Sequence, residues 1–248
     1  MDKITYYLLS AIAVLIALTV HEYCHGYAAY KMGDDTAKNF GRLTLNPLKH
    51  LDPIGALCML FFHIGWAKPV PINARNFKNP KKGFAITALA GPLSNLVLGF
   101  FSAFFYLLII ALFWEKAYFA GGFHYHLVDN TILFLGIFFT VNVGLGLFNL
   151  IPIPPFDGSR LLNVVLPPKY YFGIMKYERY IYYGMLAWLL LGDNVAMILR
   201  SIPAIAASPL LYTAVGIFSL SGMLAAAIGF VTDMIINFWQ LIPFLRIF

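Results

Sequence analysis

The sequence predicts an all-α polytopic membrane protein, with about five to six transmembrane helices and a short membrane re-entrant, β-like loop between the first and second spans. Of the 248 residues, 60% are hydrophobic and only 11% are charged, which is more apolar material than one soluble core can bury. The apolar residues form runs long enough to cross a hydrocarbon core of about 30 Å. The basic residues are concentrated in the connections between these runs.

The apolar runs set the order of the spans. The first run lacks the small-residue cleavage site of a signal peptide and is expected to remain in the membrane. We expect a core over 1–192, followed by one or two C-terminal transmembrane segments over 193–248. Within the core, the expected spans cover about 4–30, 83–113, 129–151 and 172–191.

The net charge of +6 is concentrated in the connection after the first span. Between Lys31 and Lys82, nine Lys or Arg residues are opposed by three aspartates. The positive-inside rule places such a connection on the cytoplasmic side. We therefore expect this charge to face the lipid bilayer and expect no nucleic acid as a partner.

Two histidines and a glutamate end the first apolar run, in the stretch HEYCH at 21–25. On a helix, His21 and His25 project from one face, which lets both imidazoles reach one zinc ion. Glu22 is turned by about 100° from His21 and can reach a water beside the ion without binding the metal. A cluster held at the interface by water and lipid headgroups is the alternative for this short pattern.

The depth of the two histidines agrees with a functional site. His21 follows Ile4 by 17 residues. This separation is ~26 Å of helix in a hydrocarbon core of about 30 Å. The pair is therefore expected near the cytoplasmic side, at a depth where ionisable groups are costly and function is the first hypothesis.

A catalytic zinc site needs a third protein ligand and an open position for water. Asp157, in FNLIPIPPFDGSR at 148–160, is the only carboxylate between Asp129 and Glu178. The prolines before it end the third span near the same depth, where irregular backbone is tolerated if it is buried or lines a cavity. A turn or a helix N-cap before Gly158 is the alternative for Asp157.

Three stretches in successive spans carry a resemblance to a known family. HEYCH, AGPLSN at 90–95 and FNLIPIPPFDG at 148–158 resemble the three signatures of the site-2 protease family of intramembrane zinc metalloproteases, peptidase family M50. The stretches 41–57 and 65–80 resemble its compact prokaryotic branch, which carries neither PDZ nor CBS domains. The resemblance covers roughly 4–183.

The resemblance implies an activity and a set of site residues. One Zn²⁺ per chain would be bound by His21, His25 and Asp157, with Glu22 as the catalytic base. The protein would hydrolyse peptide bonds within a transmembrane helix of a membrane-protein substrate, as in regulated intramembrane proteolysis. It would be a multi-pass protein of a prokaryotic cell membrane with its active site near the cytoplasmic side.

Polar and small residues on the second and third spans are further candidates. The family pattern matches Asn149, which we interpret as a catalytic donor to the tetrahedral oxyanion or the substrate backbone. Asn142, seven residues earlier, faces the same way and is a candidate substrate-binding residue, although either side chain can simply bond a neighbouring helix. Gly91 and Asn95 are expected to be structural, allowing close helix approach and tying down a neighbouring irregular segment.

The basic connection at 41–79 is expected to receive the substrate. RLTL and KPVPIN alternate like short strands, and a strand edge can hold an unwound substrate by main-chain pairing, which makes Val70 and Ile72 candidate substrate-binding residues. The family has a re-entrant β-loop here, and the apolar stretch 52–66 can dip into the membrane. A basic loop lying on anionic lipid is the alternative.

A membrane zinc or divalent-metal transporter is the alternative function. Transporters also place histidine and aspartate within membrane helices, but they usually have internal repeats and polar residues along a path through the bilayer. This chain shows no repeat, and the outer halves of its first two spans, 4–18 and 99–113, are almost free of polar groups. The protease is the favoured hypothesis.

Overall fold

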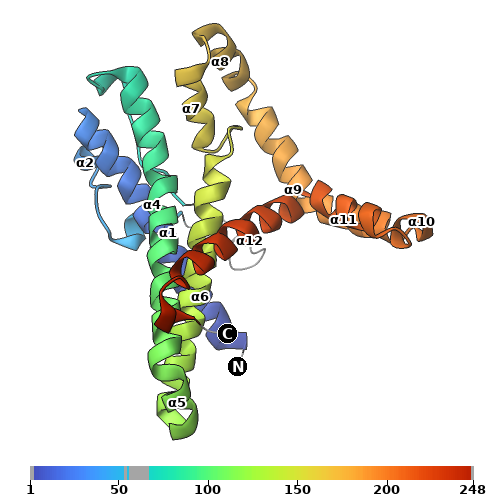
Figure 1. Ribbon diagram of the computed structural model, residues 1–248. Coiled ribbons are helices and arrows are strands. Elements are labelled where there is room, and N and C mark those ends of the chain that lie inside the picture. Colours follow the sequence, from blue (N-terminus) through green and yellow to red (C-terminus); the bar gives the residue numbers. More distant parts are fainter. Residues whose placement is uncertain (1–2, 53–54, 56–66, 247–248) are drawn as a thin grey trace.

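Three long helices side by side form the centre of the molecule (Figure 1). The structure is a computed structural model that describes residues 3–52, 55 and 67–246. Each of these helices packs against the other two, and α4 makes the most extensive contacts. These central helices are α1 (Lys3–Met32), α4 (Pro80–Ile109) and α6 (Gly122–Leu150).

Local sequence explains where these helices begin and end. The side chain of Asn79 accepts a hydrogen bond from the Lys82 N–H, and Pro80 occupies the first turn of α4. At its other end α4 continues through a π-helical turn (Ile110–Trp114) into α5 (Glu115–Ala120). Gly121 then adopts a φ of 62°, which lets the chain reverse into α6.

Small residues bring α4 and α6 close together. A Cβ on Gly99 would lie 3.0 Å from a methyl carbon of Val143, and one on Gly146 would lie 2.8 Å from Leu96. The hydroxyl of Ser102 also donates to the Leu135 carbonyl of α6 at 3.0 Å. Close backbone approach and interhelical hydrogen bonds of this kind stabilise helix pairs in membranes.

Residues 158–165 pack against α4, and the chain then leaves the central helices and returns near its end (Figure 1). Helix α12 packs on α4 and α6, and the indole N–H of Trp239 donates to the Phe100 carbonyl at 2.9 Å. Residues 168–175 form a separate helix, and the helix that covers most of the expected span over 172–191 begins at Glu178. The elements are α7 (Gly158–Val165), α8 (Pro168–Met175), α9 (Glu178–Arg200), α10 (Pro203–Ala206), α11 (Pro209–Phe218) and α12 (Leu220–Trp239).

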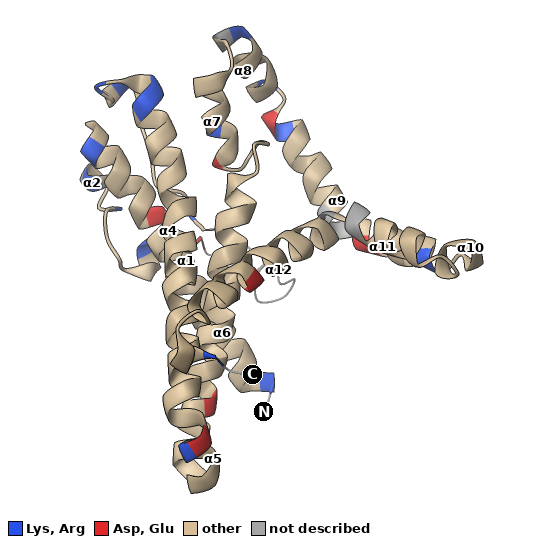
Figure 2. Ribbon diagram, viewed as in Figure 1, with Lys and Arg blue, Asp and Glu red and all other residues tan. Residues whose placement is uncertain are grey.

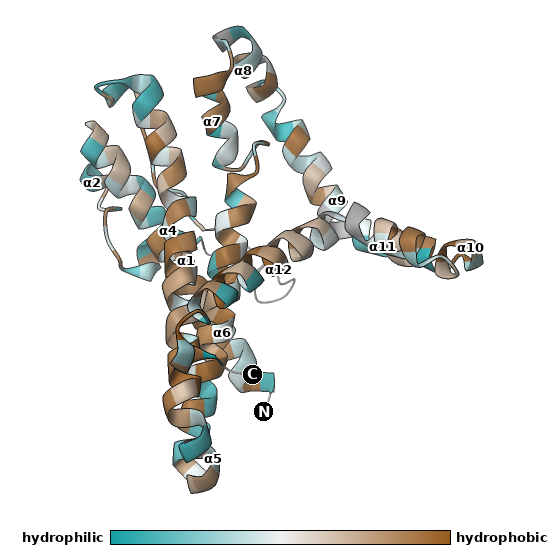
Figure 3. Ribbon diagram, in the orientation of Figure 1, coloured by the Kyte–Doolittle hydropathy of each residue, from teal (hydrophilic) through white to brown (hydrophobic). Residues whose placement is uncertain are grey.

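The prediction of an all-α polytopic membrane protein is confirmed. Among the described residues, four helical stretches are long and apolar enough to cross a membrane, or five if the two bent halves of α9 are one span. The higher of these two counts, five, meets the lower end of the expected five to six. Hydrophobic residues run along the central helices, and hydrophilic residues gather towards their ends (Figure 3).

The loop between α1 and α4 differs from the expected pair of strands. Within the described residues, the stretches 42–45 and 68–73 form no strand, and only Leu51 and Ala67 make an isolated antiparallel bridge. Pro69 and Pro71 lack the N–H groups that a sheet requires. Most of the apolar stretch expected to re-enter the membrane, 53–54 and 56–66, lies outside the described residues.

Short helical turns occur elsewhere in the described part of this loop. Each of the two 3₁₀ turns is capped by an asparagine side chain, Asn46 for the first and Asn73 for the second. Asparagine favours these positions because its side-chain oxygen bonds a nearby backbone N–H. The turns are α2 (Thr36–Asn39), η1 (Pro47–Lys49) and η2 (Ala74–Asn76).

Candidate metal centre

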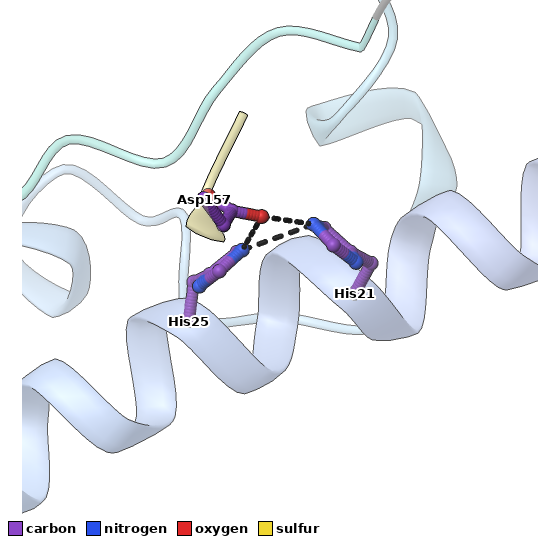
Figure 4. A group of neighbouring side chains, drawn as sticks. All are labelled: His21, His25 and Asp157. Carbon is purple, nitrogen blue, oxygen red and sulfur yellow. Dashed lines mark hydrogen bonds and ion pairs between the residues drawn. The ribbon is translucent and has the colours of Figure 1, made fainter. Parts of the chain in front are cut away.

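Two imidazoles from α1 and one carboxylate from the start of α7 converge on a single point (Figure 4). The Nε2 atoms of His21 and His25 lie 3.0 Å apart, and each is 3.1 Å from Oδ2 of Asp157. The four-residue spacing places both imidazoles on one face of α1, and the proline-broken end of α6 brings in the aspartate. Asp157 thus meets two histidines that precede it in the sequence by 136 and 132 positions.

The three donor atoms fit a zinc ion. Zinc binds imidazole nitrogen and carboxylate oxygen at about 2.0–2.2 Å, and neighbouring ligands of a tetrahedron of that size lie ~3.3 Å apart. The observed separations of 3.0–3.1 Å are close to this value. The Asp157 side chain is 26% exposed, whereas both imidazoles are buried, so the group is open on one side.

Gly91 of α4 leaves the space that the imidazoles occupy. A Cβ at this position would lie 2.3 Å from Nε2 of His25 and 2.7 Å from Cε1 of His21. Contacts this short are sterically forbidden, so only glycine allows α4 to lie directly behind the two histidines.

Helix α4 also holds the second nitrogen of each imidazole. Nδ1 of His21 lies 2.6 Å from Oδ1 of Asn95, and Nδ1 of His25 lies 2.7 Å from the Thr87 carbonyl oxygen. Both acceptors require a hydrogen on Nδ1, which leaves the Nε2 lone pairs directed at the point of convergence. Partners of this kind fix the tautomer and orientation of metal-binding histidines.

The side chain of Asp157 is directed at the histidines and does not cap α7. Asp157 occupies the N-cap position of that helix, but its carboxylate makes no capping hydrogen bond. A Cβ on Gly158 would lie 2.3 Å from the Leu150 carbonyl oxygen, so glycine allows α7 to start against the end of α6. Contact between the Phe148 and Phe156 rings, which are tilted by 59° with their centroids 4.1 Å apart, closes the same turn.

Glu22 lies outside the group of donor atoms and is bound by the loop. Its Oε2 accepts a hydrogen bond from the backbone N–H of Val70 at 2.8 Å. The loop is fixed further along by the Asn73 N–H, which donates to Oδ2 of Asp34 at 2.7 Å. Val70 is buried and its N–H is engaged, whereas Ile72 is exposed. Sequence reasoning missed this contact, which joins residues 48 positions apart.

The two candidate asparagines of α6, Asn142 and Asn149, are both bonded within the protein. Asn142 is fully buried, and its amide bonds Asn95 and the Phe138 carbonyl. This environment favours interhelical bonding, the alternative for this residue, over contact with a substrate. Asn149 is half-buried, and its Nδ2 donates to the Leu145 carbonyl of its own helix at 3.0 Å.

The membrane helices and the His–His–Asp donor set define the class of protein, a membrane zinc metallopeptidase whose HExxH motif lies on a spanning helix. The chain belongs to Peptidase family M50, which it matches over residues 9–192. The resemblance to the site-2 protease family is thereby confirmed, together with zinc as the cofactor.

Curated relatives agree with this assignment. The chain is 42% identical to "Putative zinc metalloprotease YwhC" of Bacillus subtilis over 197 residues, which are 77% of this chain and 85% of the relative. It is 32% identical to "Putative zinc metalloprotease Rip2" of Mycolicibacterium smegmatis over 162 residues, which are 62% of this chain and 56% of that protein. It is 31% identical to "Putative zinc metalloprotease MJ0611" of Methanocaldococcus jannaschii, over 65% of this chain and 72% of that one. No solved structure matches the chain.

Proposed function

We propose that this metalloprotease is an intramembrane endopeptidase that hydrolyses peptide bonds within transmembrane segments of membrane-protein substrates, as in regulated intramembrane proteolysis. The observation that carries the proposal is the convergence of His21, His25 and Asp157 between helices apolar enough to span a membrane. Because the group lies on spanning helices, a peptide bond must reach it at membrane depth. Substrates are therefore transmembrane helices.

His21, His25 and Asp157 are the proposed ligands of one zinc ion. When bound, zinc supplies a Lewis acid for the scissile carbonyl and lowers the pKa of water enough for attack at neutral pH. Glu22 is the proposed general base, which takes the proton of the attacking water and delivers it to the leaving amine, a role typically worth about 10²–10⁴-fold. The hydrogen bond from the Val70 N–H orients the carboxylate for this task.

Asn149 remains the proposed donor to the oxyanion or to the substrate backbone. It lies in the last turn of α6, within the FNLIPIPPFDG stretch that leads to Asp157. To act on a substrate, its Nδ2 must exchange the Leu145 carbonyl for the substrate oxygen. Such an exchange keeps one hydrogen bond in each state, so it costs little.

The stretch 68–73 is the proposed binding edge for the unwound substrate. A substrate helix has its backbone groups bonded internally and must open before a carbonyl becomes accessible. The N–H groups of Lys68, Val70 and Asn73 are engaged within the protein, and the two prolines have none. Ile72 therefore supplies the N–H of this edge, and the carbonyls of Val70 and Ile72, which face the same side of an extended chain, accept from substrate N–H groups.

The site is proposed to lie near the cytoplasmic side of the cell membrane. Lys and Arg gather where α1 ends and α4 begins, and again around α8 (Figure 2). Tyr23 and Tyr27 stack with their ring centroids 5.9 Å apart, and the Lys31 ammonium lies 5.3 Å from the Tyr27 ring. Aromatic and basic side chains of this kind mark the interface. The protease core is proposed to cover 1–192, with 193–248 as C-terminal transmembrane segments.

Reconstitution into liposomes tests the proposed activity. Purified wild-type protein and Glu22→Gln are incorporated with a library of single-span helical substrates, and both cleavage and zinc uptake are recorded. We expect cleavage within the spans by the wild type only, with no zinc flux. Zinc flux that survives Glu22→Gln, without any cleavage by the wild type, would favour the transporter.

A further inference from the structure

A chain of hydrogen bonds crosses the three central helices and ends on His21. Asn142 of α6 and Asn95 of α4 are both fully buried. Nδ2 of Asn95 donates to Oδ1 of Asn142 at 2.8 Å, and Oδ1 of Asn95 lies 2.6 Å from Nδ1 of His21. Backbone carbonyls flank the chain, with Phe138 bonded by Asn142 at 2.8 Å and Ala17 bonded by Asn95 at 3.1 Å.

The two carbonyls determine the direction of every bond in this chain. A carbonyl only accepts, so Asn142 must turn its NH₂ group towards Phe138 and its oxygen towards Asn95. Asn95 must then direct its NH₂ group at Asn142, and the Ala17 carbonyl requires the same orientation. Only the oxygen of Asn95 remains for His21, so Nδ1 of His21 carries the hydrogen.

We propose that Asn95 and Asn142 are positioning residues that hold His21 with its Nε2 lone pair directed at the zinc ion. Asn95 contacts the imidazole directly, and Asn142 acts through Asn95 by fixing the orientation of its amide. The inference rests on the proposed function, in which His21 is a zinc ligand. It assigns Asn142 a role in metal affinity in place of the expected contact with substrate.

Because Asn95 and Asn142 are buried, this chain of hydrogen bonds favours one orientation of their amides. If the amide of Asn142 flipped, its oxygen would face the Phe138 carbonyl oxygen. Its NH₂ group would then face the NH₂ group of Asn95. Unpaired or opposed polar groups are costly where water is absent. His25 needs no such relay, because it bonds the Thr87 backbone carbonyl directly. A side-chain substitution on α4 can therefore remove the hydrogen-bond partner of His21, whereas the partner of His25 is a backbone group.

Zinc affinity in detergent, measured by competition with a chromogenic chelator, tests the proposal independently of proteolysis. Loss of a partner behind a metal ligand typically weakens metal binding about 10- to 100-fold, which is the effect expected for Asn95→Leu and, through Asn95, for Asn142→Leu. The double variant is expected to bind zinc no more weakly than Asn95→Leu alone, because the two residues act in series.

Ser102→Ala is the matched control. It removes another buried hydrogen bond between α4 and α6, from the Ser102 hydroxyl to Leu135, at a position outside the chain that ends on His21. We expect its zinc affinity to stay within about twofold of the wild type, even if its thermal stability falls as much as that of Asn142→Leu. If Asn142→Leu fails to fold, Asn142→Gln displaces the same amide by one methylene and carries the same expectation.

Two results would overturn the inference. One is an Asn142 variant that folds and binds zinc as tightly as Ser102→Ala. The other is additive losses in the double variant, which would show that the two asparagines act separately. His21→Ala separates this failure from failure of the proposed function, because it must lose zinc if His21 is a ligand, whatever the asparagines do.

Discussion

The backbone N–H of Val70 donates to Oε2 of Glu22 at 2.8 Å, which ties the loop after α1 to the glutamate beside the metal centre. Val70 lies between two prolines, which fix their own φ and lack N–H groups. The loop therefore directs a single donor at Glu22 from a restricted backbone. This short segment thus has two proposed roles: it orients the base, and it provides the edge that binds the substrate.

Proline substitutions separate these two roles. Val70→Pro removes the N–H that binds Glu22, and we expect kcat to fall about 10- to 100-fold, the usual effect of losing a hydrogen bond to a charged group. Ile72→Pro removes the N–H proposed for substrate and is expected to raise KM for helical substrates with a smaller change in kcat. Val70→Ala keeps the N–H and serves as the control. Equal kinetic effects of both prolines would contradict this division.

Glu22→Gln tests the proposed base. The amide preserves size and accepts the Val70 hydrogen bond, but it cannot take a proton from water. We expect the variant to bind zinc as the wild type does and to cleave at least about 100-fold more slowly. Zinc content and cleavage of a labelled single-span substrate are measured on the same preparation. Near-wild-type cleavage would rule out Glu22 as the base.

Gly91→Ala is expected to disrupt the metal centre. The added Cβ would lie 2.3 Å from Nε2 of His25, so the imidazole or α4 must move. We expect zinc affinity to fall by at least about tenfold, since crowding a packed site costs roughly 1–3 kcal/mol. Gly99→Ala, on the same helix but against Val143, should lower thermal stability and leave zinc affinity unchanged. Loss of zinc by both variants would indicate a general packing defect.

Asp34 is expected to make the stability of the loop depend on pH. It is fully buried after the end of α1, and it accepts hydrogen bonds from Thr36, Asn73 and Asn76. Burial raises the pKa of this carboxyl, but the hydrogen bonds outweigh burial and hold the pKa below its ordinary value. A lowered folded-state pKa stabilises the fold above the unfolded-state pKa of about 3.9, and this stabilisation is lost as the pH falls towards the folded-state pKa.

Thermal unfolding of Asp34→Asn checks this expectation. The amide keeps one acceptor oxygen but turns an NH₂ group towards donors, so we expect a loss of about 1–3 kcal/mol at pH 7. The difference from the wild type should shrink as the pH is lowered below about 4, because the unfolded wild type then binds a proton on Asp34 that the folded protein, with its lowered pKa, does not yet bind. A difference that stays constant down to pH 3 would contradict the assigned cause.

The sequence predicted the parts of the site that depend on local pattern. The four-residue spacing of His21 and His25 is a property of one helix, and the proline-broken FNLIPIPPFDG stretch indicated Asp157 at the same depth. The Val70–Glu22 bond depends on how the loop folds back over α1, which no spacing reveals. The role expected for Asn95 was incomplete, because its contacts with His21 and Asn142 depend on the packing of three helices.

In the fold, too, the sequence predicted the elements that depend on local pattern and missed others. Apolar runs predicted α1, α4 and α6, since length and hydropathy largely determine a membrane helix. The alternating pattern of KPVPIN predicted a strand. Pro69 and Pro71 have no N–H groups, however, and they prevent strand pairing on the side of the chain that they face. The break between α8 and α9 near Tyr177 was also missed, because neither proline nor glycine interrupts the run there.

Zinc K-edge X-ray absorption on the purified protein tests the central claim most directly, because it reports the atoms bound to the metal. We expect one zinc per chain with nitrogen and oxygen ligands only, including two imidazoles, and loss of bound zinc in Asp157→Ala. A sulfur ligand from Cys24, or a spectrum unchanged in both His21→Ala and Asp157→Ala, would show that the metal is bound elsewhere.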